Sequence, residues 1–135
     1  MINKKEKYRN LGFKLTPQRL AVLEYLDGNT SHPSAEDVYK AVAEKFSTMS
    51  FATVYNTLET LKQHGKLTEL TSDPYKKRFD PATEPHHHLI CTVCRRIVDV
   101  HQSYKLSVPD RETSGFEITG SRIEFYGICP SCRKT

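Results

Sequence analysis

Residues 50–62, SFATVYNTLETLK, contain the clearest helical pattern in the first half of the chain. Ser50 is a good N-cap residue, because its hydroxyl can accept a hydrogen bond from a free backbone N–H group in the first turn. Val54, Leu58 and Leu61 follow at helical spacing, so an amphipathic helix is predicted with these side chains on its buried face.

Two more helices are predicted upstream of this stretch. Thr16 can cap the first, and Pro17 suits its first position because the N–H group that proline lacks would be unpaired there. Ser34 can cap the second, with Asp37 three residues later at the place where a capping box has its acidic residue.

Two short strands are predicted after the helices, at residues 67–71 and 77–80. Three helices followed by a β-hairpin indicate a winged helix-turn-helix. A proline-rich segment then interrupts the pattern. We therefore predict an α+β protein with a winged-helix domain at residues 1–80, a hinge at 81–85 and a small α/β domain at 86–135.

The second half of the chain has a different pattern, in which short apolar segments alternate with turns. Strands are predicted at residues 88–91, 97–100, 116–119 and 123–128. The last of these would return beside 97–100. Residues 102–114 have no clear pattern and are compatible with a short helix or a loop.

Composition and charge favour a cytoplasmic protein. Charged residues of both signs make up 27% of the 135 residues, and no apolar run reaches the length of a membrane span. The polar N-terminus does not look like a signal peptide. It forms a basic arm that would contact phosphate or else be a solvated tail. The cations of this arm are Lys4, Lys5, Lys7, Arg9, Lys14 and Arg19.

The four cysteines form two CxxC pairs, Cys91 with Cys94 and Cys129 with Cys132. Disulfides are disfavoured in the reducing cytosol, so a four-thiolate zinc site is predicted. Such a closed site would be structural, because it leaves zinc no open position for a reaction. An iron or redox dithiol site and four ordinary cytosolic thiols are the alternatives.

A second cluster of possible metal ligands surrounds the histidine triplet. His86 and His88 would share one face of a strand, with Asp80 before them and Asp99 after them. Imidazole and carboxylate donors suit Fe(II), Mn(II) or Zn(II). The alternative is a surface feature without metal. On the residues alone, His32 would be an ordinary loop histidine.

The helix at 50–62 would be the recognition helix of the winged domain, whose N-terminal side chains face base edges. Short hydroxyl and amide groups there suit hydrogen bonds to bases and contacts with thymine methyl groups. Ala52 is expected to face the core. The alternative is an ordinary helix with an exposed polar face. The residues predicted to contact DNA are Ser50, Thr53, Tyr55 and Asn56, with Lys14 and Arg19 of the arm; Lys76, Lys77 and Arg78 would touch the DNA backbone or lie in a solvated hairpin tip.

Six segments together resemble the ferric uptake regulator superfamily, in collinear order and over nearly the whole chain. The combination is highly specific, although each segment alone is not. The segments are Leu15–Arg19 (LTPQR), His32–Tyr39 (HPSAEDVY), Ala52–Asn56 (ATVYN), Arg78–Asp80 (RFD), His86–Cys94 (HHHLICTVC) and Tyr126–Cys132 (YGICPSC).

The resemblance implies a homodimer that binds an inverted-repeat DNA operator as a repressor. It implies that the α/β domain forms the dimer and that metal binding favours the arrangement that binds DNA. On this resemblance His32 becomes a ligand. Structural zinc would bind Cys91, Cys94, Cys129 and Cys132; a regulatory Fe(II) or Mn(II) would bind His32, Asp80, His86, His88 and Asp99.

Aspartates at positions 80 and 99 are similar to the peroxide-sensing branch of the superfamily, whereas iron sensors more often carry Glu at the first. In that branch bound Fe(II) reacts with hydrogen peroxide and a ligand histidine is oxidised, here His32 or His86 by position. The alternative is an iron-, zinc- or manganese-responsive uptake repressor.

The chain departs from the superfamily's pattern at three positions. Ser121 and His87 stand where iron sensors have ligands of an additional site, so that site is not predicted. Asn56 replaces a frequent Arg and suggests a different operator. A zinc hydrolase or a thiol redox module is a remote alternative, since HExxH and a βαβ pattern before the CxxC are both absent, and we expect no enzyme.

Overall fold

The structure is a computed structural model that describes residues 14–134. It divides into two compact units, Met1–Thr83 and Glu84–Thr135, and the division lies within the segment predicted as the hinge. Each unit is described by itself. The cations Lys4, Lys5, Lys7 and Arg9 of the predicted basic arm lie outside the described residues.

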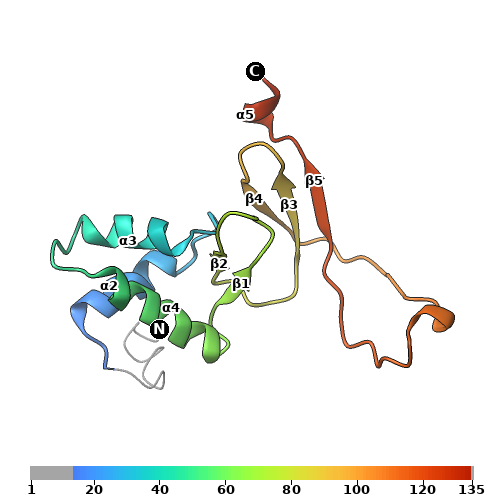
Figure 1. Cartoon of the computed structure of the whole chain (residues 1–135), viewed down its shortest axis with the longest axis horizontal. Helices are drawn as coiled ribbons and strands as arrows, with labels where there is room; N and C mark the ends of the chain where they lie inside the picture. Colours follow the sequence, from blue (N-terminus) through green and yellow to red (C-terminus); the bar gives the residue numbers. More distant parts are fainter. Residues whose placement is uncertain (1–13, 135) are drawn as a thin grey trace. The chain divides into compact units, whose positions relative to one another are not determined.

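The first unit contains the three predicted helices, and all three begin at the predicted caps. The Thr16 and Ser50 hydroxyls each accept a hydrogen bond from the backbone three residues later. Ser34 and Asp37 form a reciprocal capping box. These caps satisfy N–H groups that have no partner within a helix. The helices are α2 (Pro17–Leu26), α3 (Ala35–Ala43) and α4 (Phe51–Gln63), as Figure 1 shows.

The apolar stripes of the three helices form the core of this unit, together with Leu67 and Phe79. Val54 and Leu58 on α4 are fully buried. Ala52 is exposed, so its predicted inward orientation is wrong. With about 100° between successive residues, Ala52 lies about 200° around the helix from Val54 and faces away from the core.

The predicted hairpin is present but its strands are shorter than expected. β1 (Thr68–Leu70) pairs antiparallel with β2 (Arg78–Asp80), and Thr68 lies opposite Asp80. Phe79 at the centre of β2 is 2% exposed, so the hairpin is attached to the helical core through this side chain. The unit is therefore a winged helix-turn-helix, as predicted.

The second unit is built on a three-stranded sheet in the order β4-β3-β5. β3 (His87–Cys91) pairs antiparallel with β4 (Ile97–Val100) and parallel with β5 (Glu124–Gly127). The expectation that the last strand returns beside 97–100 is wrong, because β5 lies on the other side of β3. A short helix, α5 (Pro130–Arg133), follows β5.

The connection from β4 to β5 contains no further strand in the described residues. The strand predicted at residues 116–119 is absent, and Phe116 and Ile118 are 73% and 55% exposed. Alternating apolar residues favour a strand only where a neighbouring strand pairs with them. One 3-10 turn, η1 (Asp110–Glu112), lies in this connection. No helix among residues 14–134 is long and apolar enough to cross a membrane.

Candidate functional site

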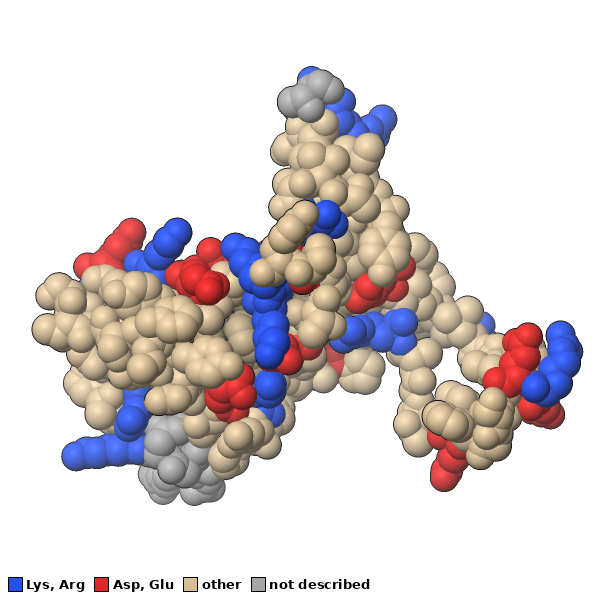
Figure 2. Space-filling model, viewed as in Figure 1, with Lys and Arg blue, Asp and Glu red and all other residues tan. Residues whose placement is uncertain are grey.

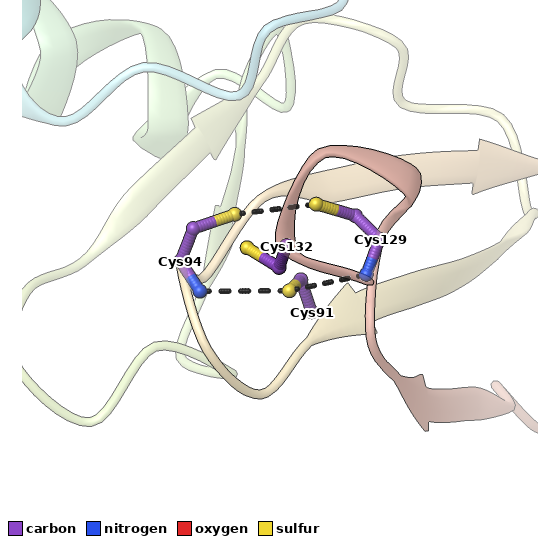
Figure 3. Close-up of side chains that lie close together, drawn as sticks. All are labelled: Cys91, Cys94, Cys129 and Cys132. Carbon is purple, nitrogen blue, oxygen red and sulfur yellow. Dashed lines mark hydrogen bonds between the residues drawn. The ribbon is translucent and has the colours of Figure 1, made fainter. Parts of the chain in front are cut away.

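The four cysteines come together at one end of the second unit, as the side chains in Figure 3 show. Cys91 ends β3 and Cys94 lies in the turn after it. Cys129 is the N-cap residue of α5 and Cys132 lies within that helix. All four sulfur atoms lie within 4.8 Å of one another, and the cysteines are free thiols rather than disulfides.

This cluster fits a tetrahedral zinc ion in geometry and chemistry. Zinc–sulfur bonds of about 2.3 Å place two sulfurs of a tetrahedron about 3.8 Å apart. The Sγ atoms of Cys94 and Cys129 are 3.7 Å apart. Four thiol donors leave no position for water, so the arrangement suits a structural ion.

Backbone hydrogen bonds favour the ionised form of one thiol in the cluster. The backbone N–H groups of Cys94 and Cys129 donate to the Sγ atom of Cys91 at 3.5 and 3.3 Å. They lower the pKa of Cys91 to about 6. The Cys129 sulfur beside Cys132 raises the pKa of Cys132 to about 12. The four thiols therefore resist ionising together unless a cation offsets their charge.

One histidine–aspartate pair lies in the first unit. The Nε2 atom of His32 is 3.3 Å from Oδ2 of Asp80, and the two residues are 0% and 1% exposed. The backbone N–H of Ala82 donates to the other oxygen, Oδ1 of Asp80, at 2.9 Å. This hydrogen bond orients the carboxylate so that Oδ2 faces the imidazole. Sequence reasoning alone would have left His32 as a loop residue.

A second group of donors lies on the sheet of the second unit. Oδ1 of Asp99 is 3.0 Å from Nε2 of His86 and 3.4 Å from Nε2 of His88. Asp99 lies opposite His88 in the β3–β4 register, which explains their approach. His87 is held differently, because its Nδ1 accepts a hydrogen bond from the Ile123 N–H at 2.8 Å. The predicted alternation along this strand is thus present.

The hydrogen bond of His86 determines which ring nitrogen can bind a metal. Its Nδ1 is 2.6 Å from the carbonyl oxygen of Glu84, and a carbonyl can only accept, so Nδ1 carries the proton. In the neutral ring this leaves the lone pair on Nε2, beside Asp99. Imidazole and carboxylate donors in both units fit Fe(II), Mn(II) or Zn(II) chemically. His101 is exposed, and its ring centroid is 5.5 Å from that of His86.

The N-terminal part of α4 presents the side chains predicted to contact DNA. Ser50, Tyr55 and Asn56 are exposed and Thr53 is half-buried. The Ser50 and Thr53 hydroxyls are 2.9 Å apart, so they share a hydrogen bond. Figure 2 shows both signs of charge on the visible face of the first unit, so no patch of one charge marks a DNA-binding side in this view.

Sequence reasoning missed Phe51, which begins α4 and is 41% exposed. Its ring stacks on Tyr55 with centroids 6.3 Å apart and meets the edge of Tyr39 at 5.9 Å. The signal that could have found Phe51 is a large apolar residue directly after an N-cap serine. The exposed ring of Phe51 enlarges the apolar part of the surface at the N-terminal end of α4.

The remaining predicted DNA contacts differ in how free their side chains are. Lys14 is exposed, whereas Arg19 donates from Nη1 to the Lys14 carbonyl at 2.7 Å. In the hairpin, Lys76 and Lys77 are exposed. The Arg78 side chain is only 11% exposed and turns back into its own unit, so the idea that it touches the DNA backbone is not supported.

Comparison with known proteins gives a consistent result. The model of the Ferric uptake regulator family matches residues 10–126. The Peroxide operon regulator of Bacillus subtilis (strain 168) is 42% identical over 96% of this chain and 90% of its own length.

Two solved structures resemble the fold. The ferric uptake regulator of Francisella tularensis, solved with iron, is 28% identical and has a TM-score of 0.70, over 90% of this chain and 96% of its own. PerR from Streptococcus pyogenes, described in connection with peroxide sensing and gene regulation, is 29% identical with a TM-score of 0.53, over 97% and 94% of the two chains.

Proposed function

The chain belongs to the ferric uptake regulator family, and we propose that it is a metal-dependent DNA-binding repressor that senses hydrogen peroxide. The observation that carries the proposal is the similarity to the Bacillus subtilis peroxide regulator over 96% of the chain. The histidine–aspartate contacts also support the proposal, because each group offers imidazole nitrogens and carboxylate oxygens that can bind a metal ion. We propose a homodimer that binds an inverted-repeat operator.

Two metal sites follow from this proposal. Zinc on Cys91, Cys94, Cys129 and Cys132 would stabilise the fold of residues 84–135. A regulatory Fe(II) or Mn(II) would bind His32 and Asp80 from the first unit with His86, His88 and Asp99 from the second. The first group offers two donors and the second offers three, so an ion bound by both groups would have five protein ligands. Metal binding would therefore favour one arrangement of the two units over others, which is how occupancy would control DNA affinity.

When bound, Fe(II) would supply the reaction with hydrogen peroxide that oxidises a ligand histidine. The protein's part is to hold imidazoles beside the reacting centre. His86 is held by its Nδ1–H bond to Glu84, and His32 is buried against Asp80. Oxidation of either ring would remove a nitrogen donor, weaken metal binding and release DNA.

Mass spectrometry of the Fe(II)-loaded protein after a small dose of hydrogen peroxide tests this function. We expect one added oxygen atom on the peptide that contains His32 or His86, loss of operator binding and retention of zinc. The same dose given to the Mn(II)-loaded protein is the control and should leave both peptides unchanged. Unmodified histidines with DNA binding still governed by reversible metal occupancy would rule out peroxide sensing and indicate a metal-uptake repressor.

The amide of Asn56 is expected to read a base. Replacing Asn56 by Ala should weaken binding to the specific operator by about 1–3 kcal/mol, because a base-edge hydrogen bond is lost. Binding to unrelated DNA should hardly change. Gln63→Ala, at the other end of α4, removes an exposed amide and is the matched control. Fluorescence anisotropy with both DNAs at fixed salt measures the effect; equal losses on the two DNAs would contradict a base contact.

A further inference from the structure

We propose that Arg78 is the positioning residue that holds the ligand loop of His32 in place and ties it to the wing hairpin. The inference rests on the proposed function in one respect, namely that His32 binds the regulatory metal. It assigns to Arg78 a role inside the first unit instead of a contact with DNA. All of the contacts that carry it lie within residues 29–83.

The guanidinium of Arg78 donates hydrogen bonds to two successive carbonyl groups of the ligand loop, which comprises residues Ser31–Pro33. Its Nε donates to the His32 carbonyl oxygen, and its Nη2 donates to the Ser31 carbonyl oxygen at 3.3 Å. The next carbonyl, that of Pro33, accepts from the backbone N–H of Phe79 at 2.8 Å. Three consecutive carbonyls are thus held by two neighbouring residues of β2.

The loop needs such a clamp because its backbone is unfavourable. His32 has a φ of +54°, in the left-handed region that side chains with a Cβ atom rarely adopt. It also precedes Pro33, and a residue before proline prefers an extended backbone. Without the clamp the loop would relax towards extended conformations. The His32 imidazole would then leave its position 3.3 Å from Asp80.

Strand geometry explains why Arg78 can do this. Side chains alternate along a strand, so Arg78 and Asp80 lie on one face of β2 while Phe79 lies on the other and enters the core. The strand that carries the ligand Asp80 therefore also positions the ligand His32. One three-residue strand therefore positions both proposed ligands of this unit, His32 and Asp80.

The third nitrogen of Arg78 reaches the hairpin turn. Nη1 is 3.4 Å from Oδ2 of Asp73, whose other oxygen accepts the backbone N–H of Tyr75 at 2.9 Å. The Asp73 side chain is 3% exposed. The planar guanidinium can serve two carbonyls and a carboxylate at once, which a lysine ammonium on a flexible stem cannot match. The wing turn and the ligand loop are therefore expected to move together.

The test measures Mn(II) binding to the zinc-loaded full chain, because Mn(II) fits the donors and avoids oxidation. Arg78→Lys keeps the positive charge but removes the planar set of N–H donors. The Mn(II) dissociation constant of this variant should rise about 10–100-fold, as for other residues that support a metal ligand. Hydrogen exchange without Mn(II) should speed up at residues 31–34. Lys77→Gln, from the same hairpin but 59% exposed, is the control and should leave both measurements unchanged.

A second variant separates positioning from a general loss of stability. Asp73→Asn should weaken Mn(II) binding less than Arg78→Lys, and the double variant should resemble Arg78→Lys, since Asp73 acts through Arg78. Unchanged Mn(II) affinity in Arg78→Lys, with wild-type binding intact, would overturn the inference alone. A wild-type chain that binds no Mn(II) beyond its zinc would overturn the proposed function and the positioning role with it.

Discussion

Replacing Cys94 by serine is expected to cost the protein its zinc and to unfold residues 84–135, while residues 14–83 stay folded. The second unit has few buried apolar side chains among the described residues: Ile90, Cys91 and Ile97. A core this small cannot offset the loss of chain entropy. Structural zinc contributes about 10–16 kcal/mol in zinc-finger peptides, so it would supply most of this unit's stability.

Cys94 is the informative position because its side chain is exposed, unlike that of the buried Cys91. Native mass spectrometry would measure zinc content, and thermal unfolding followed by circular dichroism would measure stability. Ser131→Ala changes an exposed residue between two of the cysteines and is the matched control. If Cys94→Ser kept one zinc per chain and unfolded like the wild-type protein, the four-thiolate site would be wrong.

Replacing Asp99 by asparagine is expected to abolish regulatory metal binding in practice, with an Mn(II) affinity at least about 100-fold lower, since ligand loss should exceed the 10–100-fold cost of losing a supporting residue. Asp99 lies within 3.0 Å of His86 and 3.4 Å of His88, so it belongs to both ligand contacts of the sheet. Asparagine has nearly the same shape but carries no charge, and a neutral amide oxygen is a weak donor to a divalent ion. Metal-dependent operator binding should disappear with it.

The control for this variant is Asp110→Asn, which removes the same charge from the exposed η1 turn. Calorimetric titration with Mn(II) would measure affinity, and zinc content would show that the cysteine site is intact. An Asp99→Asn protein that bound Mn(II) as tightly as Asp110→Asn would remove Asp99 from the ligand set. Full retention of metal-dependent DNA binding would contradict the proposed control by this site.

Much of the first unit was predictable because its signals are local. The caps at Thr16, Ser34 and Ser50 act within one helical turn, and the structure has them where the residue types indicate. Spacing also identified the buried stripe of α4. The small apolar side chain of Ala52 favours a buried position, but its angle around the helix places it on the exposed face.

Prediction of the second unit was weaker because pairing between distant segments decides it. Residues 116–119 have an alternating pattern but remain exposed without a paired strand. β5 was expected beside β4 and instead pairs with β3, since a pattern says that a strand forms and not which strand it joins. The family resemblance, rather than any local signal, identified His32 as a possible ligand.

Caps, spacing and residue chemistry act over a few residues, so they indicate the helices, their first residues, the hairpin and the four cysteines without any knowledge of the fold; His32 is a ligand candidate only through the family resemblance. Which of these groups meet depends on the tertiary structure. It brings the four cysteine sulfurs within 4.8 Å of one another and places the His32 imidazole against Asp80. It also turns Arg78 inward, where its side chain donates to the carbonyl oxygen of His32. The physical reason is that the left-handed backbone of His32 is unfavourable by itself. It is stabilised by the hydrogen bond from Arg78, which lies 46 residues away in the sequence and comes close only when the core holds β2 in place.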